Sequence, residues 1–287
     1  MICLIIKNTK AMNMKHIMSL IIAMMLSVGN IFSQATYVDT PVFKVGEKAT
    51  YGIYFNLGFI SMKAGKIHFE VGEAVVRGED CYKLSVNGYT QGMFERFYVV
   101  RDTFTSYISK KTLQPVYYHD GKHEDSYWSY STYLYTDNGN ADSLHVNFEY
   151  IKRKGTSRTE FNISKKACDL IATCYKVRNL DVASMSRGDV AAFSLLFEDI
   201  VYELGLKFTG KETVKLKDGS KYKTSVFVPT LIKGDLFKND EDLKIYVADD
   251  DNHYPVYVEA SLKMGKAVAS LESISGTKYE LSGKKKK

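Results

Sequence analysis

Two histidines, His119 and His123, bracket the turn-forming sequence Asp120-Gly121-Lys122. A three-residue hairpin loop would place the two imidazoles opposite each other on neighbouring strands, as a metal-binding pair requires. A tighter turn on Asp120-Gly121 would pair His119 with Lys122 instead and would separate the imidazoles. A polar, solvated hairpin tip explains these residues without a ligand, so we predict no metal site here.

A second polar cluster, Asp249-Asp250-Asp251-Asn252, offers acidic oxygens of the kind that bind Ca²⁺. A calcium loop of the EF-hand type needs Gly at its sixth position and Glu at its twelfth, where this chain has Tyr254 and Ala260. Because the spacing excludes that loop, we predict a turn in which Asp and Asn side chains bond to their own backbone.

The segment Gly205–Glu212 comes within one residue of the phosphate-binding loop G-x-x-x-x-G-K-[ST]. Its last position is Glu212, which places a negative charge where phosphates would bind, and the residues that follow are strand-like rather than helical. We therefore reject nucleotide binding and predict no cofactor.

Catalytic residues cannot be assigned from the sequence. It contains no nucleophile elbow and no reactive-cysteine signature. Scattered carboxylates such as Glu70 and Glu149 could form an acid–base pair only if the fold brings them to within about 5–10 Å. Whether the protein is an enzyme stays open, and we favour a non-enzymatic role.

Aromatic residues crowd two neighbouring strand-like runs and give the best lead to a ligand. The candidate ligand-binding residues are Tyr117, Tyr127, Trp128, Tyr130, Tyr133 and Tyr135. Within one strand, Tyr127, Tyr133 and Tyr135 share a face, while Trp128 and Tyr130 share the other. One face would pack inward and the other would line a groove suited to sugar rings or acyl chains. Ordinary packing of a sheet is the alternative.

Many short runs of strand-forming residues must position these side chains. The chain has 21 Tyr and 15 Phe against four Pro in 287 residues, and turn signals recur about every eight to twelve residues. The most regular stretch contains Leu243–Ala248, Pro255–Leu262 and Lys266–Leu271. This pattern predicts a mainly β fold, with a strongly curved antiparallel sheet or partly open barrel.

One α-helix, at about residues 165–179, is expected to pack against the sheet. Ser164 can cap it, and its apolar residues have helical spacing: Ala167, Leu170, Ile171, Cys174 and Tyr175. A helix would hold Cys168 and Cys174 roughly 9 Å apart, too far for a disulfide. A bond from Cys81 to either of them, or three unpaired thiols, both stay open.

The first 33 residues have the order of a secretory signal peptide. Three lysines precede the apolar run Ile17–Val28, and Ser33 is a small residue at the expected cleavage point. The run is shorter than the roughly 20 residues of a membrane span. We predict export to the periplasm or cell envelope, with Met1 or Met14 as the start.

The charge of the chain is concentrated at its two ends. Residues 1–33 contain three of the 39 Lys and Arg, and Lys284–Lys287 contribute four, so residues 34–283 carry 32 bases against 33 acids. A nucleic-acid-binding protein needs a basic face that this balance does not provide. We predict no nucleic-acid partner and a disordered lysine tail at 284–287.

Several stretches, taken in order, resemble the exported bacterial family catalogued as domain of unknown function 3108. They are Gly46-Glu47, Ala64-Gly65, Arg101–Ile108 with Leu113-Gln114-Pro115, Asp169–Arg178, Arg187-Gly188-Asp189, Val247–Asp250, Tyr254-Pro255-Val256 and Met264-Gly265. The similarity would span about residues 43–273. It implies an exported, β-rich envelope protein, and the family has no established activity to transfer.

Domain organisation and function follow as expectations. Ser61–Lys66 and Ser261–Lys266 share Ser, Lys, Gly and Lys at matching positions, so the predicted single β-rich domain at 34–283 has two similar β units as an alternative. We expect an envelope protein, with peripheral association as one form, that binds an apolar or amphiphilic component, a lipid or a glycan. The alternative is a hydrolase that acts on envelope polysaccharide through a carboxylate pair.

Overall fold

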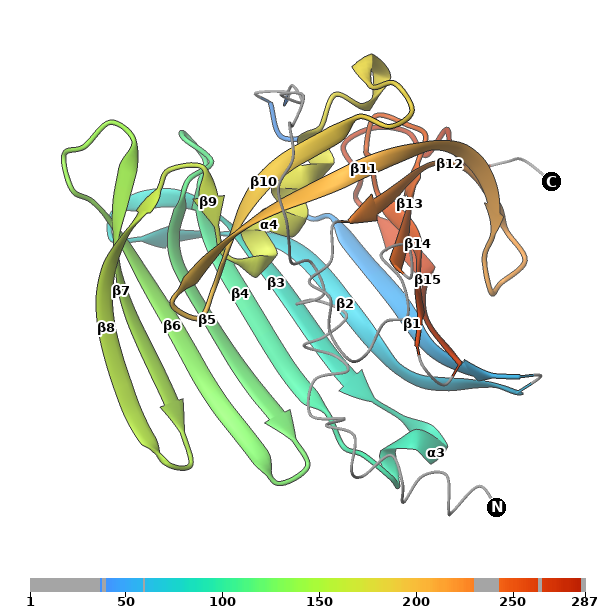
Figure 1. Cartoon of the computed structure of the whole chain (residues 1–287), viewed down its shortest axis with the longest axis horizontal. Coiled ribbons are helices and arrows are strands. Elements are labelled where there is room, and N and C mark those ends of the chain that lie inside the picture. Colours follow the sequence, from blue (N-terminus) through green and yellow to red (C-terminus); the bar gives the residue numbers. More distant parts are fainter. Residues whose placement is uncertain (1–36, 38–39, 59, 230–242, 263–264, 285–287) are drawn as a thin grey trace.

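The computed structural model describes residues 37, 40–58, 60–229, 243–262 and 265–284, and one 15-stranded sheet dominates it (Figure 1). The strands are β1 (Lys48–Leu57), β2 (Ile60–Val76), β3 (Glu79–Thr90), β4 (Arg101–Ser109), β5 (Pro115–Glu124), β6 (Tyr127–Asp137), β7 (Ser143–Lys152), β8 (Gly155–Ser164), β9 (Ala167–Cys168), β10 (Val190–Phe197), β11 (Ile200–Lys215), β12 (Lys221–Pro229), β13 (Leu243–Ala248), β14 (Pro255–Ser261) and β15 (Lys266–Ser275). The helical elements are α3 (Gly92–Glu95), α4 (Leu170–Lys176) and the 3₁₀ turns η2 (Val177–Asn179) and η3 (Val182–Ser184).

The sheet has the spatial order β8-β7-β6-β5-β4-β3-β2-β1-β15-β14-β13-β12-β11-β10-β9. Strands consecutive in sequence are neighbours, except for β8 and β9, which lie at the two ends of the sheet. β15 pairs with β1, and the pairs are antiparallel except for β9 with β10. In Figure 1, β10 and β11 pass in front of the curved face formed by β1–β8. Helix α4 contacts β3 and β4 on one side and β10 on the other, so the sheet wraps around it. The predicted mainly β fold, a curved and nearly closed sheet with one packed helix, is confirmed.

Irregular registers and close backbone approaches accompany the curvature of the sheet. The register of β1 with β2 shifts between Ile53 and Tyr54, and such bulges bend a strand and increase its twist. Gly65 lies beside this shift, where an added Cβ atom would lie 2.3 Å from the carbonyl oxygen of Tyr89. A Cβ at Gly265 would likewise lie 2.2 Å from the carbonyl oxygen of Asn56. Each of the two matching hexapeptides therefore needs its glycine because a larger residue would clash with a neighbouring backbone carbonyl. The interpretation of the domain as two similar β units stays a prediction.

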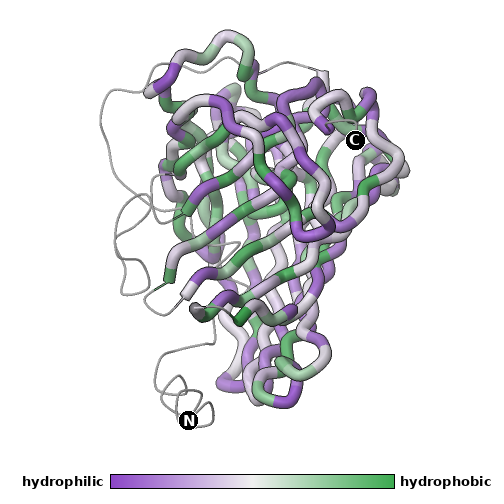
Figure 2. The backbone as a smooth tube through the Cα atoms, turned by 90° about the vertical axis from the view of Figure 1, so that its right-hand side faces the viewer, coloured by the Kyte–Doolittle hydropathy of each residue, from purple (hydrophilic) through white to green (hydrophobic). Residues whose placement is uncertain are grey.

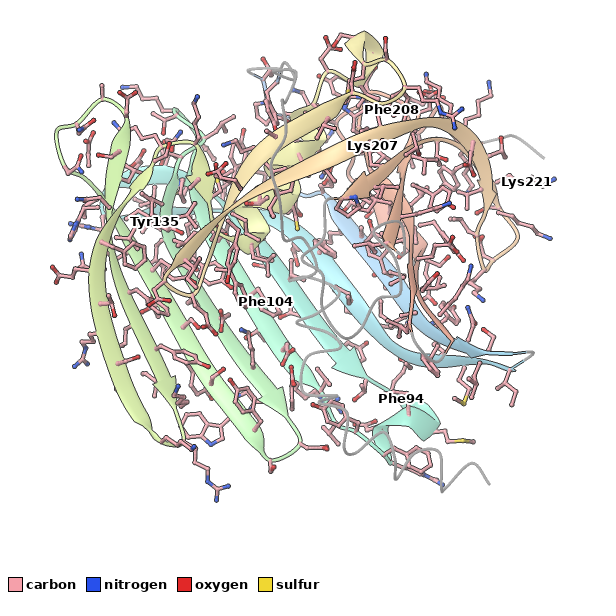
Figure 3. All side chains as sticks on the ribbon, viewed as in Figure 1. Phe94, Phe104, Tyr135, Lys207, Phe208 and Lys221 are labelled. Atoms are coloured by element: carbon pink, nitrogen blue, oxygen red, sulfur yellow. The ribbon has the colours of Figure 1, made fainter. Side chains whose placement is uncertain are left out.

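The core lies on the inner face of the sheet, where alternate residues of each strand point inward. Figure 2 shows hydrophobic and hydrophilic positions alternating along the strands. Phe104 and Tyr135 are buried members of this core and project from the inner face in Figure 3. One continuous cluster of buried side chains therefore joins the sheet to α4.

The helix is shorter than the sequence predicts, and Ser164 does not cap it. The carboxylate of Asp169 accepts hydrogen bonds from the backbone N–H groups of Ile171 (3.1 Å) and Ala172 (2.9 Å), which sets the start of α4. Ala167 and Cys168 pair with β10 instead. A strand contact that is distant in sequence thus displaces the first turn of the predicted helix.

The predicted hairpin turn at Asp120-Gly121 is wrong. Both residues lie within β5, and the chain reverses at Asp125, whose φ of 51° is in the left-handed region. A Cβ on Gly121 would lie 3.1 Å from the ring of Tyr130, so this glycine makes room for an aromatic ring across the strands. His119 and His123 therefore lie on one strand, and no hairpin loop places them opposite each other.

The structure also bears on the predicted phosphate loop, the cysteines and the two ends of the chain. Gly205–Glu212 lies within β11, in agreement with its rejection as a phosphate loop. Cys81, Cys168 and Cys174 are free thiols, and no helix in the described part of the chain is long and apolar enough to cross a membrane. The predicted signal peptide at residues 1–33 lies outside the described residues, as do the last three lysines. Lys284 itself forms an antiparallel bridge with Tyr222.

Candidate ligand-binding site

An apolar cavity of about 180 Å³ lies between α4 with its following turns and strands β1, β2 and β10–β15. Its walls are almost entirely hydrocarbon, and they include Ile67, Leu195, Leu206, Phe227 and Leu243. Several lining residues on β13 and β14, such as Val247 and Val258, are only partly buried, so the apolar wall reaches the protein surface there. An apolar space of this kind can take an apolar guest without leaving polar groups unsatisfied.

One face of the helical segment forms a wall of the cavity. Leu170, Thr173, Cys174 and Val177 all line it, and their spacing of three and four residues puts them on one side of a helix. The Asp169 cap fixes where this face begins, and the hydroxyl of Ser106 on β4 donates a 2.8 Å hydrogen bond to that carboxylate. The hydrogen bond from Ser106 therefore links the position of the helix, and with it the shape of the cavity, to strand β4, which is not part of the cavity wall.

A buried ion pair borders the cavity where α4 ends. Arg178 donates to both carboxylate oxygens of Glu47, at 2.6 and 3.1 Å, and its Nε and Nη2 donate to the carbonyl oxygen of Asn252 at 3.2 and 3.1 Å. The two side chains are 4% and 0% exposed. The guanidinium carbon also lies 4.3 Å from the ring centroid of Tyr254 and 5.4 Å from that of Tyr175. Arg178 therefore has its charge and most of its donors satisfied within the protein.

The turn between β13 and β14 completes this junction. The backbone N–H of Asn252 donates to Asp250 Oδ1 (3.1 Å), which confirms the predicted turn in which Asp and Asn side chains bond to their own backbone. The amide nitrogen of Asn252 donates to the carbonyl oxygens of Tyr279 and Glu280, and so holds the C-terminal segment. His253 Nδ1 donates to the carbonyl oxygen of Arg178 at 2.8 Å. Three segments far apart in sequence therefore meet at one end of the cavity.

Tyr175, on the helix side of the cavity, carries a deeply buried polar atom. The Tyr175 side chain lines the cavity and is 2% exposed, and its hydroxyl has no hydrogen-bond partner among the described residues. Burial and the neighbouring Tyr254 hold the pKa of Tyr175 well above its usual range, so the phenol stays protonated. A buried, protonated hydroxyl without a partner costs about 1–3 kcal/mol.

The Cys174 thiol in the same wall is unreactive. Burial, together with the Asp169 carboxylate, raises the pKa of Cys174 to about 12, so its nucleophilic thiolate is rare at neutral pH. Cys174 therefore supplies no nucleophile to the cavity at neutral pH.

A second interior region, on β4 and β5, is filled with charge. Asp102, Asp120, Lys122 and Glu124 are all buried on the inner face, and Asp102 Oδ2 and Asp120 Oδ1 have no partner among the described residues. Burial and then the Glu124 carboxylate raise the pKa of Asp102 to about 7. Lys122 Nζ lies 5.1 Å from the ring centroid of Phe197, at the end of β10. This row of charges is covered by protein.

The six predicted aromatic ligand residues do not come together. Tyr127, Tyr133 and Tyr135 point inward, with Tyr133 stacked on Tyr118 at 5.0 Å, whereas Tyr117, Trp128 and Tyr130 lie on the outer face. The division of β6 into two faces follows the predicted alternation. None of the six lines the cavity, so a ligand site on these residues stays a separate prediction.

The remaining predicted chemistry is scattered. Glu70 on β2 pairs with Lys48 and Glu149 on β7 pairs with Arg158. Their strands are five positions apart in the sheet, about 24 Å along it at the usual strand spacing, so the two do not form an acid–base pair. In the described part of the chain, no group of three or more His, Cys, Asp or Glu could hold a metal ion.

Sequence reasoning missed the residues that border the cavity, above all Tyr175, Arg178 and Glu47. The sequence did contain a signal for them. Three of the stretches that carry the family resemblance include or adjoin these residues, namely Gly46-Glu47, Asp169–Arg178 and Tyr254-Pro255-Val256, but the resemblance does not mark them as a site. The structure shows that these stretches meet in one buried cluster around Arg178.

Comparison with known proteins supports this assignment of family and fold. A search of curated proteins finds no match. The solved structure of a beta-barrel-like protein of the domain of unknown function DUF1849, from Brucella abortus, is similar with a TM-score of 0.51 and 8% sequence identity, over 84% of this chain and 100% of that one. At this identity the likeness shows the fold alone. The family model of DUF3108, described as a protein of unknown function, matches residues 50–272. Because that match covers most of the chain, the protein belongs to the DUF3108 family.

Proposed function

We propose that this protein binds an apolar or amphiphilic molecule in the cavity beside α4, and that it does so without catalysis. The observation that carries the proposal is the lining itself, formed by apolar side chains from β1, β2, β10–β15 and α4 around about 180 Å³. A well-packed interior leaves few spaces larger than a water molecule. A space of this size, kept open by eight strands and a capped helix, supports a role in holding a guest.

The size of the cavity favours one acyl chain or a small apolar ring as that guest. An apolar cavity of about 150 Å³ holds benzene, whereas sites for drug-sized ligands measure about 300–1,000 Å³. Each buried methylene contributes about 0.8 kcal/mol, so an eight-carbon chain contributes roughly 6 kcal/mol before the cost of association. A larger lipid would therefore insert one chain and leave its remainder at the surface near β13 and β14.

The location of the protein forms part of the proposal. The charged, apolar and polar order of residues 1–33 supports export to the periplasm or cell envelope, where acyl lipids are abundant. Fractionation of the producing cells, with the mass of the purified chain, tests this point. Loss of about 33 N-terminal residues from an envelope fraction is the expected result, and a full-length cytoplasmic chain would contradict it.

The alternative, a polysaccharide hydrolase, has one observation in its favour. Asp102 and Glu124 are neighbouring acids on the inner face, and a pKa of about 7 at Asp102 suits a general acid. Both side chains are at most 2% exposed, however, so a polymer has no access to them in this conformation. Binding in the apolar cavity requires no such opening of the sheet, and we favour it.

A cavity-filling variant provides the test. The neutral fluorescent probe N-phenyl-1-naphthylamine should bind the mature protein, and Val258→Trp should weaken that binding at least tenfold by occupying the cavity with an indole ring. The matched control is Val75→Trp, on an exposed position of β2 that does not line the cavity. Equal binding by Val258→Trp, Val75→Trp and the unchanged protein would overturn the proposal, provided that all three show the same circular dichroism.

A further inference from the structure

We propose that one edge of the sheet docks the protein onto an anionic lipid bilayer. Strands β3, β5 and β7 run in the same direction, because each is antiparallel to the strand that separates it from the next. Their C-terminal ends therefore share one edge of the sheet, which carries α3 and the β5–β6 and β7–β8 turns (Figure 1). We call residues 91–101, 125–126 and 152–154 the docking edge. None of them lines the cavity, so docking is independent of binding there.

The connection between β3 and β4 is held in place from its inner side. Phe94 packs against the core, and the hydroxyl of Tyr98 donates a 3.0 Å hydrogen bond to the buried carboxylate of Glu124 on β5. The backbone N–H of Val99 donates to Asp125 Oδ1 at 2.8 Å, which joins the connection to the β5–β6 turn. The fold therefore fixes which side chains of this connection face solvent.

The outer side of the same connection presents large apolar side chains to solvent. Met93 is 67% exposed, Phe97 42% and Val99 37%. Exposed apolar side chains that cluster in this way mark an interaction surface, whereas single ones scattered over a protein need no explanation. Side chains of these types can enter the boundary between the head groups and the acyl chains of a bilayer.

Positive charge lies beside this apolar patch. Arg96 is exposed between Met93 and Phe97, and the β7–β8 turn is reached through the exposed run Lys152-Arg153-Lys154. Within the described part of the chain, the ion pair of the docking edge joins Arg101 to Glu95, so Arg96 and the two turn residues keep unpaired charges. Strands β3 and β7 are four positions apart, about 19 Å at the usual strand spacing, so one flat surface can contact both groups.

The combination of unpaired bases and apolar side chains selects the partner. An anionic bilayer attracts basic residues through its surface potential and takes apolar side chains into its interfacial layer, so it uses both features. The turns at the opposite edge pair their charges instead, as Lys110 does with Glu73 and Lys165 with Asp137. Charge complementarity therefore favours the docking edge as the side that faces the lipid.

Sedimentation with lipid vesicles tests the proposal. The purified protein should bind vesicles of phosphatidylcholine with about 30% phosphatidylglycerol at least tenfold more tightly than vesicles of phosphatidylcholine alone. Salt at about 0.5 M should remove most of that difference, because it screens charges beyond about 4 Å. Each variant is compared with the unchanged protein in the same processed form, so residues outside the described part contribute equally to both.

A pair of double variants tests the charges. Arg153→Gln/Lys154→Gln should weaken binding to the anionic vesicles by roughly 25-fold, since each base near such a surface contributes about fivefold. The matched control is Arg77→Gln/Lys111→Gln, which removes two exposed bases from turns at the opposite edge. The control should bind like the unchanged protein.

A pair of single variants tests the apolar patch. Met93→Ser should weaken binding to the anionic vesicles about fivefold, because a polar side chain gains little from the interfacial layer. Val75→Ser is the control, because Val75 is 68% exposed on β2 beside the opposite edge. Circular dichroism should be the same for all variants, since each changed side chain is exposed.

Each result decides for or against the docking edge. Equal affinity for the two kinds of vesicle, or equal losses in the edge variants and their controls, would overturn the proposal. Absence of binding to the anionic vesicles would also overturn it, and would make an acidic protein surface the partner to test. All variants should still bind N-phenyl-1-naphthylamine like the unchanged protein, so failure of docking is distinct from failure of the proposed function.

Discussion

Two regions of the same concave face are filled in opposite ways. Beside α4, strands β10–β15 enclose an apolar cavity, and the charge pair that borders it, Arg178 with Glu47, is hydrogen-bonded within the protein. On β4 and β5, the inner face carries the buried row of Asp102, Asp120, Lys122 and Glu124, and two of its oxygens have no partner among the described residues.

The difference shows where this fold can accept a guest. A satisfied ion pair beside a hydrocarbon wall leaves the space apolar, so a chain can enter without displacing polar contacts. A row of buried charges is costly to desolvate and is covered by the end of β10, so the β4–β5 region is expected to respond to pH rather than to a ligand. The predictions that follow test this contrast.

Arg178→Met should have the largest effect on stability, because it leaves the Glu47 carboxylate buried without its partner. We expect a loss of about 3–5 kcal/mol in the free energy of unfolding, measured by urea denaturation followed by circular dichroism. The double variant Arg178→Met/Glu47→Leu should recover most of that loss. A single variant that costs less than about 1 kcal/mol would show that the pair does not anchor the junction.

Asp102→Asn should change how stability depends on pH. Because burial raises the pKa of Asp102 to about 7, the folded protein retains a proton that the unfolded chain releases above its ordinary pKa of about 4. This contribution to stability is complete below pH 4 and is lost as the pH rises to 7. The variant cannot ionise, so its stability relative to the unchanged protein should increase between pH 4 and pH 8, by on the order of 4 kcal/mol. Parallel stability curves across that range would rule out the raised pKa.

Asp169→Ala should cost about 1–2 kcal/mol, since it removes the cap of α4 and the partner of Ser106. Asp169→Asn is the matched control, because its amide oxygen can still accept the cap hydrogen bonds from Ile171 and Ala172, while its amide nitrogen takes the position of the oxygen that accepts from Ser106. The midpoint of thermal unfolding is the measurement. If the two variants behave alike, the helix does not depend on this cap.

Trp128→Ala should have the smallest effect, because Trp128 lies on the outer face of β6 and does not line the cavity. We expect its affinity for N-phenyl-1-naphthylamine to stay within about twofold of that of the unchanged protein, by fluorescence titration. A much weaker affinity would favour the aromatic strand over the cavity as the ligand site.

How far the sequence could be interpreted differs between these regions. The alternation of Tyr127 to Tyr135 predicted which side chains of β6 point inward, because a strand has a fixed two-residue period. The same local rules failed at Asp120-Gly121, where a turn-forming pair lies inside a strand. There the deciding contact is the ring of Tyr130 on the neighbouring strand, which is not visible in a local pattern.

The sequence by itself determined the strand-rich class of this protein, the turn at Asp249–Asn252 and the order of segments that identifies its family, because these depend on local periodicity and turn chemistry. Only the tertiary structure decided that Glu47, Arg178 and Tyr254 meet around one guanidinium, and that the side chain of Tyr175 lines an apolar cavity. Glu47 and Arg178 are separated by 131 positions in the chain, and Arg178 and Asn252 by 74. No local rule sets such distances, because they follow from how 15 strands curve and pair.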